Sequence, residues 1–238
     1  MVENSTRQPV WTETPQATPT FINTPTVIWF PPTATYVPLP TTVVTPTLEI
    51  KPDVGEIIFS DSFINPSDWS LNQSANGIVA LGQNEISLAI SQPDLYLYTL
   101  RTTPILDNFY LEVTASPGIC IADDEYGVLF RMTPDLGFYR LALTCNGQIR
   151  LDRYHKGQAS SPQPKIFSGA VPPGAPSSSR LAIWASGKNI IVFVNDQYQF
   201  TISDPSLMSG SIGLFIRSSD HTSLSVSFSD LEVYKVVE

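Results

Sequence analysis

The chain has 238 residues, a formal net charge of −9 at pH 7, and only 15% charged residues. The negative charge excludes nucleic acid as the main partner, because phosphate contacts need a surplus of lysine and arginine. No run of about 18 apolar residues occurs, so we expect no membrane-spanning segment. Soluble domains usually carry about 25% charged residues. The lower fraction here, with serine, threonine, asparagine and glutamine in its place, indicates an exported protein.

The N-terminal part of the chain, residues 1–54, is dominated by threonine and proline. Proline removes amide donors and β-branched threonine prefers extended backbone, so this arm favours polyproline II or strand and excludes helix. Its composition resembles the linkers of exported bacterial proteins. The start, Met1-Val2-Glu3-Asn4, lacks the basic and apolar regions of a signal peptide, and we expect a signal or anchor upstream.

Two interpretations of this arm stay open. One is a solvated, semi-rigid stalk. The other is a docking arm, because Val27, Ile28, Trp29 and Phe30 are too apolar for a spacer that stays in water. Such a segment can add as a strand to a sheet edge of the same molecule or of a neighbour, which would give self-association.

From residue 55 to the C-terminus the sequence changes to short alternating runs separated by turn residues about every 8–12 positions. No 3.6-residue apolar period occurs, so we expect no helix. The pattern predicts an all-β domain, a two-sheet antiparallel jelly-roll sandwich. The predicted strands are 57–63, 86–90, 95–101, 109–115, 126–132, 138–144, 148–154, 180–185, 189–194, 198–202, 210–217 and 224–236.

Several of these runs resemble one known family. The segment Phe59-Ser60-Asp61-Ser62-Phe63, followed by Trp69, resembles the opening of concanavalin A-like lectin/glucanase domains. Residues 126–131 and 138–141 resemble their paired central strands, and 226–233 resembles their closing strand. The resemblance, which extends to laminin-G-like and 3-keto-disaccharide hydrolase-like domains, implies that the closing strand pairs beside the first and that Trp69 plugs one end of the sandwich. It predicts fold rather than function, because this fold carries lectins, glycosidases, adhesion modules and spacers.

The chain has two cysteines, Cys120 and Cys145. A disulfide between them would suit an oxidising, extracellular or cell-surface location, and closing that loop would contribute about 3–4 kcal/mol. Two buried free thiols are the alternative. No zinc-binding spacing of cysteine and histidine is present.

The densest acidic cluster is Asp123, Asp124 and Glu125, in a predicted loop before a strand. We interpret it as a solvated loop or a calcium site, and calcium is the only cofactor that the sequence suggests. Glycosidases of the resembled fold need paired carboxylates on one strand, and the glucanases among them carry an E-x-D-x-x-E run that this chain lacks. We therefore expect no enzymatic activity.

A cluster of arginine and aromatic residues spans three consecutive predicted strands. Period-2 alternation places one set of side chains together on the outer face of the sheet, provided that the register holds. Planar guanidinium donors beside aromatic rings suit a sugar or a carboxylate ligand. The alternatives are cross-strand Arg–Asp pairing on a solvated sheet and a protein contact. The predicted ligand-binding residues are Arg131, Phe138, Arg140, Arg150, Asp152 and Tyr154.

These patterns favour a non-catalytic extracellular or cell-surface module that recognises carbohydrate or a surface polymer. The main alternative is a structural subunit whose N-terminal arm docks on a neighbouring subunit and builds a surface assembly or filament. A glycoside-active enzyme is the weaker alternative.

Overall fold

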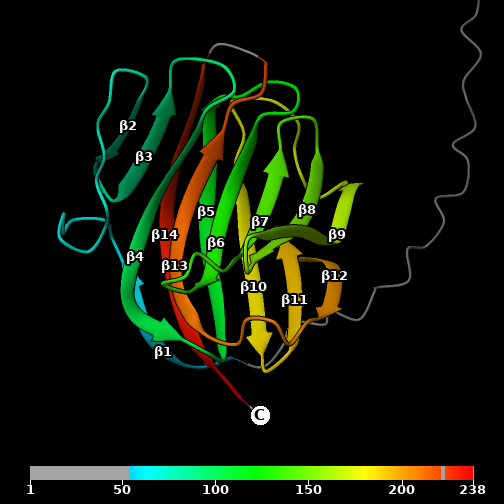
Figure 1. The fold of residues 1–238 in the computed structure, drawn as a ribbon. Helices are drawn as coiled ribbons and strands as arrows, with labels where there is room; N and C mark the ends of the chain where they lie inside the picture. Colours follow the sequence, from blue (N-terminus) through cyan, green and yellow to red (C-terminus); the bar gives the residue numbers. More distant parts are fainter. Residues whose placement is uncertain (1–53, 221–222, 238) are drawn as a thin grey trace, which may run out of the picture. The chain divides into compact units, whose positions relative to one another are not determined.

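The computed structural model describes residues 54–220 and 223–237, and these form two packed β-sheets (Figure 1). The all-β, two-sheet sandwich is therefore confirmed. Among these residues no helix is long and apolar enough to cross a membrane. The predicted arm-docking residues Val27, Ile28, Trp29 and Phe30 lie outside the described residues.

The two sheets are antiparallel throughout. The larger has the strand order β12-β11-β10-β5-β14-β3-β2, and β1 also pairs with β14. Its strands are β1 (Val54–Asp61), β2 (Gly77–Leu81), β3 (Glu85–Ile90), β5 (Phe109–Ile119), β10 (Ser179–Ser186), β11 (Asn189–Val194), β12 (Gln197–Ser203) and β14 (Leu224–Val236). The pairing of β1 with β14 is the closing contact that the resemblance implies.

The six-stranded sheet has the order β4-β13-β6-β7-β8-β9. Its strands are β4 (Tyr96–Leu106), β6 (Glu125–Met132), β7 (Phe138–Thr144), β8 (Gln148–His155), β9 (Gln158–Phe167) and β13 (Gly210–Arg217). The three strands predicted to carry the ligand-binding residues, β6, β7 and β8, are direct neighbours at its centre.

Every predicted strand is present, and two strands were not predicted. β9 has the sequence QASSPQPKIF, and its two prolines and many polar residues hide the alternation. The structure tolerates them because β9 is an edge strand, where proline removes no hydrogen bond from the interior of the sheet. β2 has only five residues and pairs only with β3 among the named strands.

The core lies between the two sheets and consists of the inward side chains of both. Phe109, Leu111 and Val113 alternate inward along β5, and Leu141 and Leu143 do so along β7. All five are fully buried. The apolar side chains of each alternating strand therefore face the core between the sheets, and the intervening side chains form the two outer faces of the sandwich.

The opening motif seen in the sequence links the two sheets at one end. Asp61 on β1 accepts a hydrogen bond from the indole N–H of Trp69 (2.9 Å) and one from Arg101 on β4 (2.6 Å), both through Oδ2. Its Oδ1 accepts the backbone N–H of Phe63 at 2.7 Å. The Trp69 side chain is 4% exposed and its ring packs on Phe63, so the resemblance placed this residue correctly.

This network yields a stability prediction for Asp61→Ala. The substitution leaves the buried Trp69 N–H without its acceptor and the Arg101 guanidinium with only the more exposed carboxylate of Asp68. We expect the free energy of unfolding to fall by about 3–5 kcal/mol, measured by urea denaturation. Asp68→Ala is the matched control, because Asp68 also contacts Arg101, at 3.1 Å, but its side chain is 36% exposed. Equal losses for the two variants would contradict the proposed role of the buried carboxylate.

Candidate functional site

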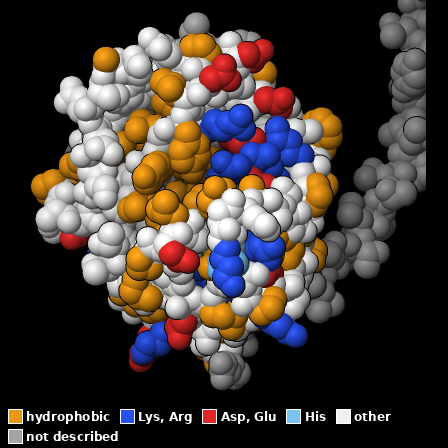
Figure 2. Space-filling view, viewed as in Figure 1, with side chains coloured by type: hydrophobic (Ala, Val, Ile, Leu, Met, Phe, Trp, Pro, Cys, Tyr) orange, Lys and Arg blue, Asp and Glu red, His pale blue; other side chains and the backbone are white. Residues whose placement is uncertain are grey.

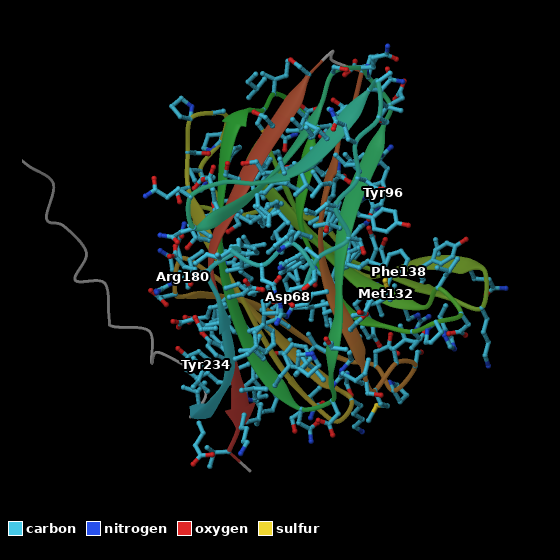
Figure 3. All side chains as sticks on the ribbon, turned by 90° about the vertical axis from the view of Figure 1, so that its left-hand side faces the viewer. Asp68, Tyr96, Met132, Phe138, Arg180 and Tyr234 are labelled. Atoms are coloured by element: carbon cyan, nitrogen blue, oxygen red, sulfur yellow. A yellow bond between two sulfur atoms is a disulfide. The ribbon has the colours of Figure 1, made fainter. Side chains whose placement is uncertain are left out.

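The outer face of the six-stranded sheet carries a pocket of about 480 Å³. Labelled side chains of this face, Tyr96, Met132 and Phe138, lie on the opposite side of the sandwich from Arg180 and Tyr234 (Figure 3). The pocket is lined by Tyr96, Phe138, Arg140, Arg150, Asp152, Arg153, Tyr154, Ala159, Ser160 and Ser161.

Five of the six residues predicted from alternation converge in this pocket. Phe138 and Arg140 come from β7, and Arg150, Asp152 and Tyr154 come from β8. The antiparallel register sets Arg140 opposite Asp152 and Phe138 opposite Tyr154. Both strands keep strict period-2 alternation here, which is why the sequence placed these side chains correctly.

Arg131 is the exception, and its predicted place on the outer face of the sheet is wrong. Between the pairs Ser211↔Met132 and Gly213↔Leu129 the register of β6 and β13 shifts, and Arg131 has φ 51°. This β-bulge turns Arg131 inward, where the side chain is fully buried, and returns Met132 to the outer face. The Arg131 guanidinium donates to the carbonyl oxygens of Leu207 (3.0 Å) and Asp107 (2.9 Å), so it supports the end of the sandwich.

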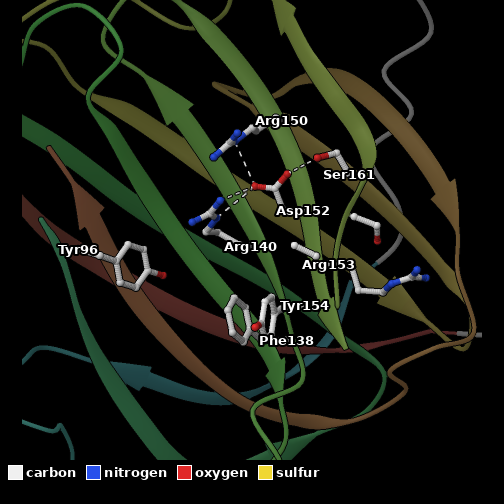
Figure 4. A pocket seen from close by; sticks show the side chains of 10 residues that line it. Tyr96, Phe138, Arg140, Arg150, Asp152, Arg153, Tyr154 and Ser161 are labelled. Carbon is white, nitrogen blue, oxygen red and sulfur yellow. Dashed lines mark hydrogen bonds and ion pairs between the residues drawn. The ribbon is translucent and has the colours of Figure 1, made fainter. Parts of the chain in front are cut away.

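Asp152 organises the basic half of the pocket. Its Oδ2 accepts two bonds from Arg140, from Nη2 at 2.7 Å and Nε at 3.2 Å, and lies 3.1 Å from Nε of Arg150. Its Oδ1 accepts the hydroxyl of Ser161 on β9 at 2.6 Å. One carboxylate thus holds two guanidinium groups side by side (Figure 4). Arg153 points away and instead donates to Asp204 at 2.6 Å.

Glu125, at the start of β6, is a second carboxylate on this face and is 1% exposed. Arg150 Nη2 donates to its Oε2 at 2.8 Å, Arg217 approaches the same oxygen at 3.6 Å, and Lys165 lies 3.5 Å from Oε1. Three cations therefore share one buried carboxylate. Figure 2 shows lysine and arginine side chains gathered beside a hydrophobic area on this face.

The acidic run does not have the geometry of a calcium site. Asp124 is buried, and its Oδ1 accepts the backbone N–H and the hydroxyl of Ser219. Asp123 accepts a hydrogen bond from Asn146, and Glu125 faces cations. All three carboxylates already interact with donor groups of the protein. This arrangement does not support the prediction that they form a calcium site. Among the described residues the one group with metal-ligand spacing is Cys120, Asp124 and Cys145, and its two sulfurs are bonded to each other.

The predicted disulfide between Cys120 and Cys145 is present, with the two Cα atoms 5.7 Å apart. It joins the segment before β6 to the turn after β7. The backbone N–H of Cys145 also donates to the carbonyl oxygen of Asp124 at 3.0 Å. The disulfide therefore braces the start of β6 and the end of β7, two neighbouring strands of the sheet that carries the pocket.

Aromatic rings form the other half of the pocket. Phe138 and Tyr154 stack with their ring centroids 5.6 Å apart, and Tyr154 is 38% exposed. Tyr96 stacks on Phe215 at 5.5 Å, and the Arg140 guanidinium lies 5.6 Å from the Phe215 ring centre. Burial of its hydroxyl raises the pKa of Tyr96 to about 12, against the opposing effect of the Arg140 charge, so the phenol is a neutral donor at physiological pH.

The hollow continues from this aromatic half into an apolar cleft of about 270 Å³, which shares three of its lining residues with the pocket. The cleft is lined by Tyr96, Tyr98, Leu129, Met132, Leu136, Phe138 and Tyr154. We call the pocket and the cleft together the groove. One end of it is therefore basic, the middle aromatic and the other end apolar.

Sequence reasoning missed Tyr96, Phe215 and Ser161. Tyr96 and Tyr98 alternate with Leu97 on β4, and that pattern predicts a shared face for the two tyrosines. What it does not predict is which sheet β4 joins: β4 reaches the groove only because β13, more than a hundred residues later, lies between it and β6.

No protein-family model and no curated protein matches the chain. Solved structures do match. The carbohydrate-binding module CBM66 from Bacillus subtilis has a TM-score of 0.56 at 15% identity, covering 71% of this chain and 96% of its own. A Bacillus subtilis protein of unknown function with a galectin-like fold has a TM-score of 0.59 at 12% identity, covering 78% and 99%. A β-glucanase from Bacillus licheniformis has a TM-score of 0.58 at 12% identity, covering 78% and 100%.

This chain has the concanavalin A-like jelly-roll fold. The structures that share it include both a carbohydrate-binding module and glycoside hydrolases. At these identities the likeness shows the fold alone, and the function has to be argued from the groove.

The Glu125 network yields a second stability prediction. Glu125→Gln leaves Arg150, Lys165 and Arg217 close together without their shared counter-charge. We expect the free energy of unfolding to fall by about 2–3 kcal/mol, less than for a fully buried pair because the three cations keep contact with water.

Urea denaturation measures this change, and Glu56→Gln is the matched control. Glu56 pairs with Lys235, and both side chains are mostly exposed, so its substitution should leave the free energy of unfolding nearly unchanged. A loss for Glu125→Gln no larger than that of the control would show that the network contributes nothing to stability.

Proposed function

We propose that this protein is a non-catalytic extracellular module that binds carbohydrate in the groove. The observation that carries the proposal is the arrangement of a stacked aromatic pair, the half-buried Phe138 and the exposed Tyr154, beside two fixed guanidinium groups in one pocket. Sugars present apolar ring faces and polar edges, and a binding site of this kind combines apolar walls with a few placed polar groups. The pocket volume of about 480 Å³ is in the range of small-molecule sites.

The carboxylates of this face support a binding role over a catalytic one. A glycosidase needs one carboxylic acid to protonate the leaving group and a second carboxylate as nucleophile or base. Here Asp152 accepts hydrogen bonds from Arg140 and Ser161, and Glu125 is buried among cations. The oxygens of both carboxylates are therefore occupied by protein donors, and Glu125 is also buried, so neither is placed to act on a glycosidic bond.

An extracellular or cell-surface location fits the same proposal. The disulfide persists in an oxidising compartment. The low charged fraction of the chain, 15%, also fits an exported protein. The ligands of the proposed module would be polymers outside the cell.

Binding is tested with Tyr154→Ala. Truncation removes the exposed ring of the stacked pair, and we expect affinity for the bound saccharide to fall about tenfold, or 1.4 kcal/mol. A glycan array identifies the saccharide and isothermal titration calorimetry measures its Kd. Tyr198→Ala is the matched control, since Tyr198 is 46% exposed but lies on β12 of the other sheet.

The same saccharides, incubated with the protein, should be recovered without new reducing ends. Release of reducing sugar that is lost in Asp152→Asn would replace the proposed module by an enzyme. Absence of binding across the array, or equal Kd values for Tyr154→Ala and wild type, would remove the groove as a carbohydrate site.

A further inference from the structure

The basic end of the groove is rich in hydrogen-bond donors and poor in acceptors. A guanidinium carries five N–H donors. Arg140 gives two of them to Asp152, and Arg150 gives one to Glu125 while its Nε faces Asp152. Both groups therefore retain donors beyond those that the two carboxylates accept, and both line the pocket with side chains 20% and 16% exposed.

The carboxylates of the same region already accept hydrogen bonds from protein groups. Asp152 accepts from Arg140 through one oxygen and from Ser161 through the other. Glu125 is 1% exposed, so a ligand cannot reach it. A neutral sugar, whose hydroxyl groups are donors as well as acceptors, would find no unoccupied carboxylate here, and the remaining side-chain acceptors are hydroxyl groups such as those of Tyr154 and Ser161. A ligand rich in acceptors meets the remaining guanidinium donors directly.

The local charge also favours a ligand that is rich in acceptors and negatively charged. Four cations, Arg140, Arg150, Lys165 and Arg217, surround the carboxylates of Asp123, Glu125 and Asp152 on this face. This region is therefore cationic in a chain of net charge −9. Guanidinium groups match the planar, two-oxygen geometry of a carboxylate. The Arg140 guanidinium also lies over two aromatic rings, 5.9 Å from the ring centre of Tyr96 and 5.6 Å from that of Phe215.

From these observations, and resting on the proposed carbohydrate-binding function, we infer that the ligand is an acidic saccharide. Its carboxylate binds the Arg140–Arg150 pair, and the adjoining ring lies over Phe138 and Tyr154. The apolar cleft beyond these rings receives the less polar face of the next residues. The groove thus sets the direction of the ligand as well as its charge.

The test compares acidic saccharides with their own uncharged counterparts. The probes are oligogalacturonates against their methyl esters, and glucuronate-containing oligosaccharides against the same chains with reduced carboxyl groups. We expect the wild-type protein to bind the acidic member of at least one pair about tenfold more tightly in calorimetry. Raising the salt concentration should weaken that binding, because part of it is charge attraction.

Arg140→Lys keeps the positive charge but removes the two-pronged donor, and it should lose most of the preference for the acidic member. Arg180→Lys is the matched control. Arg180 is a half-exposed arginine paired with Asp196 on the other sheet, and its substitution should leave both Kd values unchanged.

The outcomes separate the two proposals. Equal Kd values for the two members of every pair that binds would overturn the acidic-ligand inference and leave carbohydrate binding standing. No binding to any member of any pair would overturn both. A preference for the acidic member that persists in Arg140→Lys and in Arg150→Lys would overturn the placement of the carboxylate. The wild-type comparison needs no variant, so the preference for acidic saccharides can be tested even where a substitution destabilises the fold.

Discussion

Charge compensation on the outer face of the six-stranded sheet is the constraint on which the groove depends. Partly buried cationic side chains lose part of their hydration. A sheet surface accommodates them at low free-energy cost only if carboxylates lie close enough to compensate their charge. Asp152 meets this need for Arg140 and Arg150, and Glu125 does so for Arg150, Lys165 and Arg217. The same contacts fix the positions of the guanidinium groups before any ligand arrives, which lowers the ordering cost of binding.

The period-2 pattern explains why much of this site is visible in the sequence. On β7 and β8 alternation is unbroken, so Arg140, Arg150, Asp152 and Tyr154 could be placed on one face without a structure. Arg131 could not be placed, because a single extra residue in β6 reverses the faces beyond it. A bulge depends on the partner strand β13, where a Cβ at Gly210 would lie 2.3 Å from the backbone carbon of Arg131. The sequence of β6 alone contains no pattern that would predict this close approach of β13.

Features that depend on the order of strands in the sheet could not be predicted from the sequence either. Tyr96 joins the groove only through β13, and β9 contributes Ser161 from an edge strand whose prolines hide its pattern. The end-plugging motif of Asp61, Phe63 and Trp69 was recognisable by resemblance, and the structure supplies its physical reason, a buried carboxylate that joins β1 to β4. The fold was therefore more predictable than the candidate site. The apolar alternation that defines the core is visible within each strand, whereas the site combines side chains from strands that are distant in the sequence.

The most direct test of the account is an amide chemical-shift titration of the isotopically labelled protein with the saccharide that binds most tightly on the array. The account predicts shifts that concentrate on β7 and β8, around Phe138, Arg140 and Tyr154, with smaller changes on β4. It predicts none on β10, β11 and β12 of the other sheet. Shifts centred on Trp184 of β10 and Tyr198 of β12, with the groove unchanged, would contradict it.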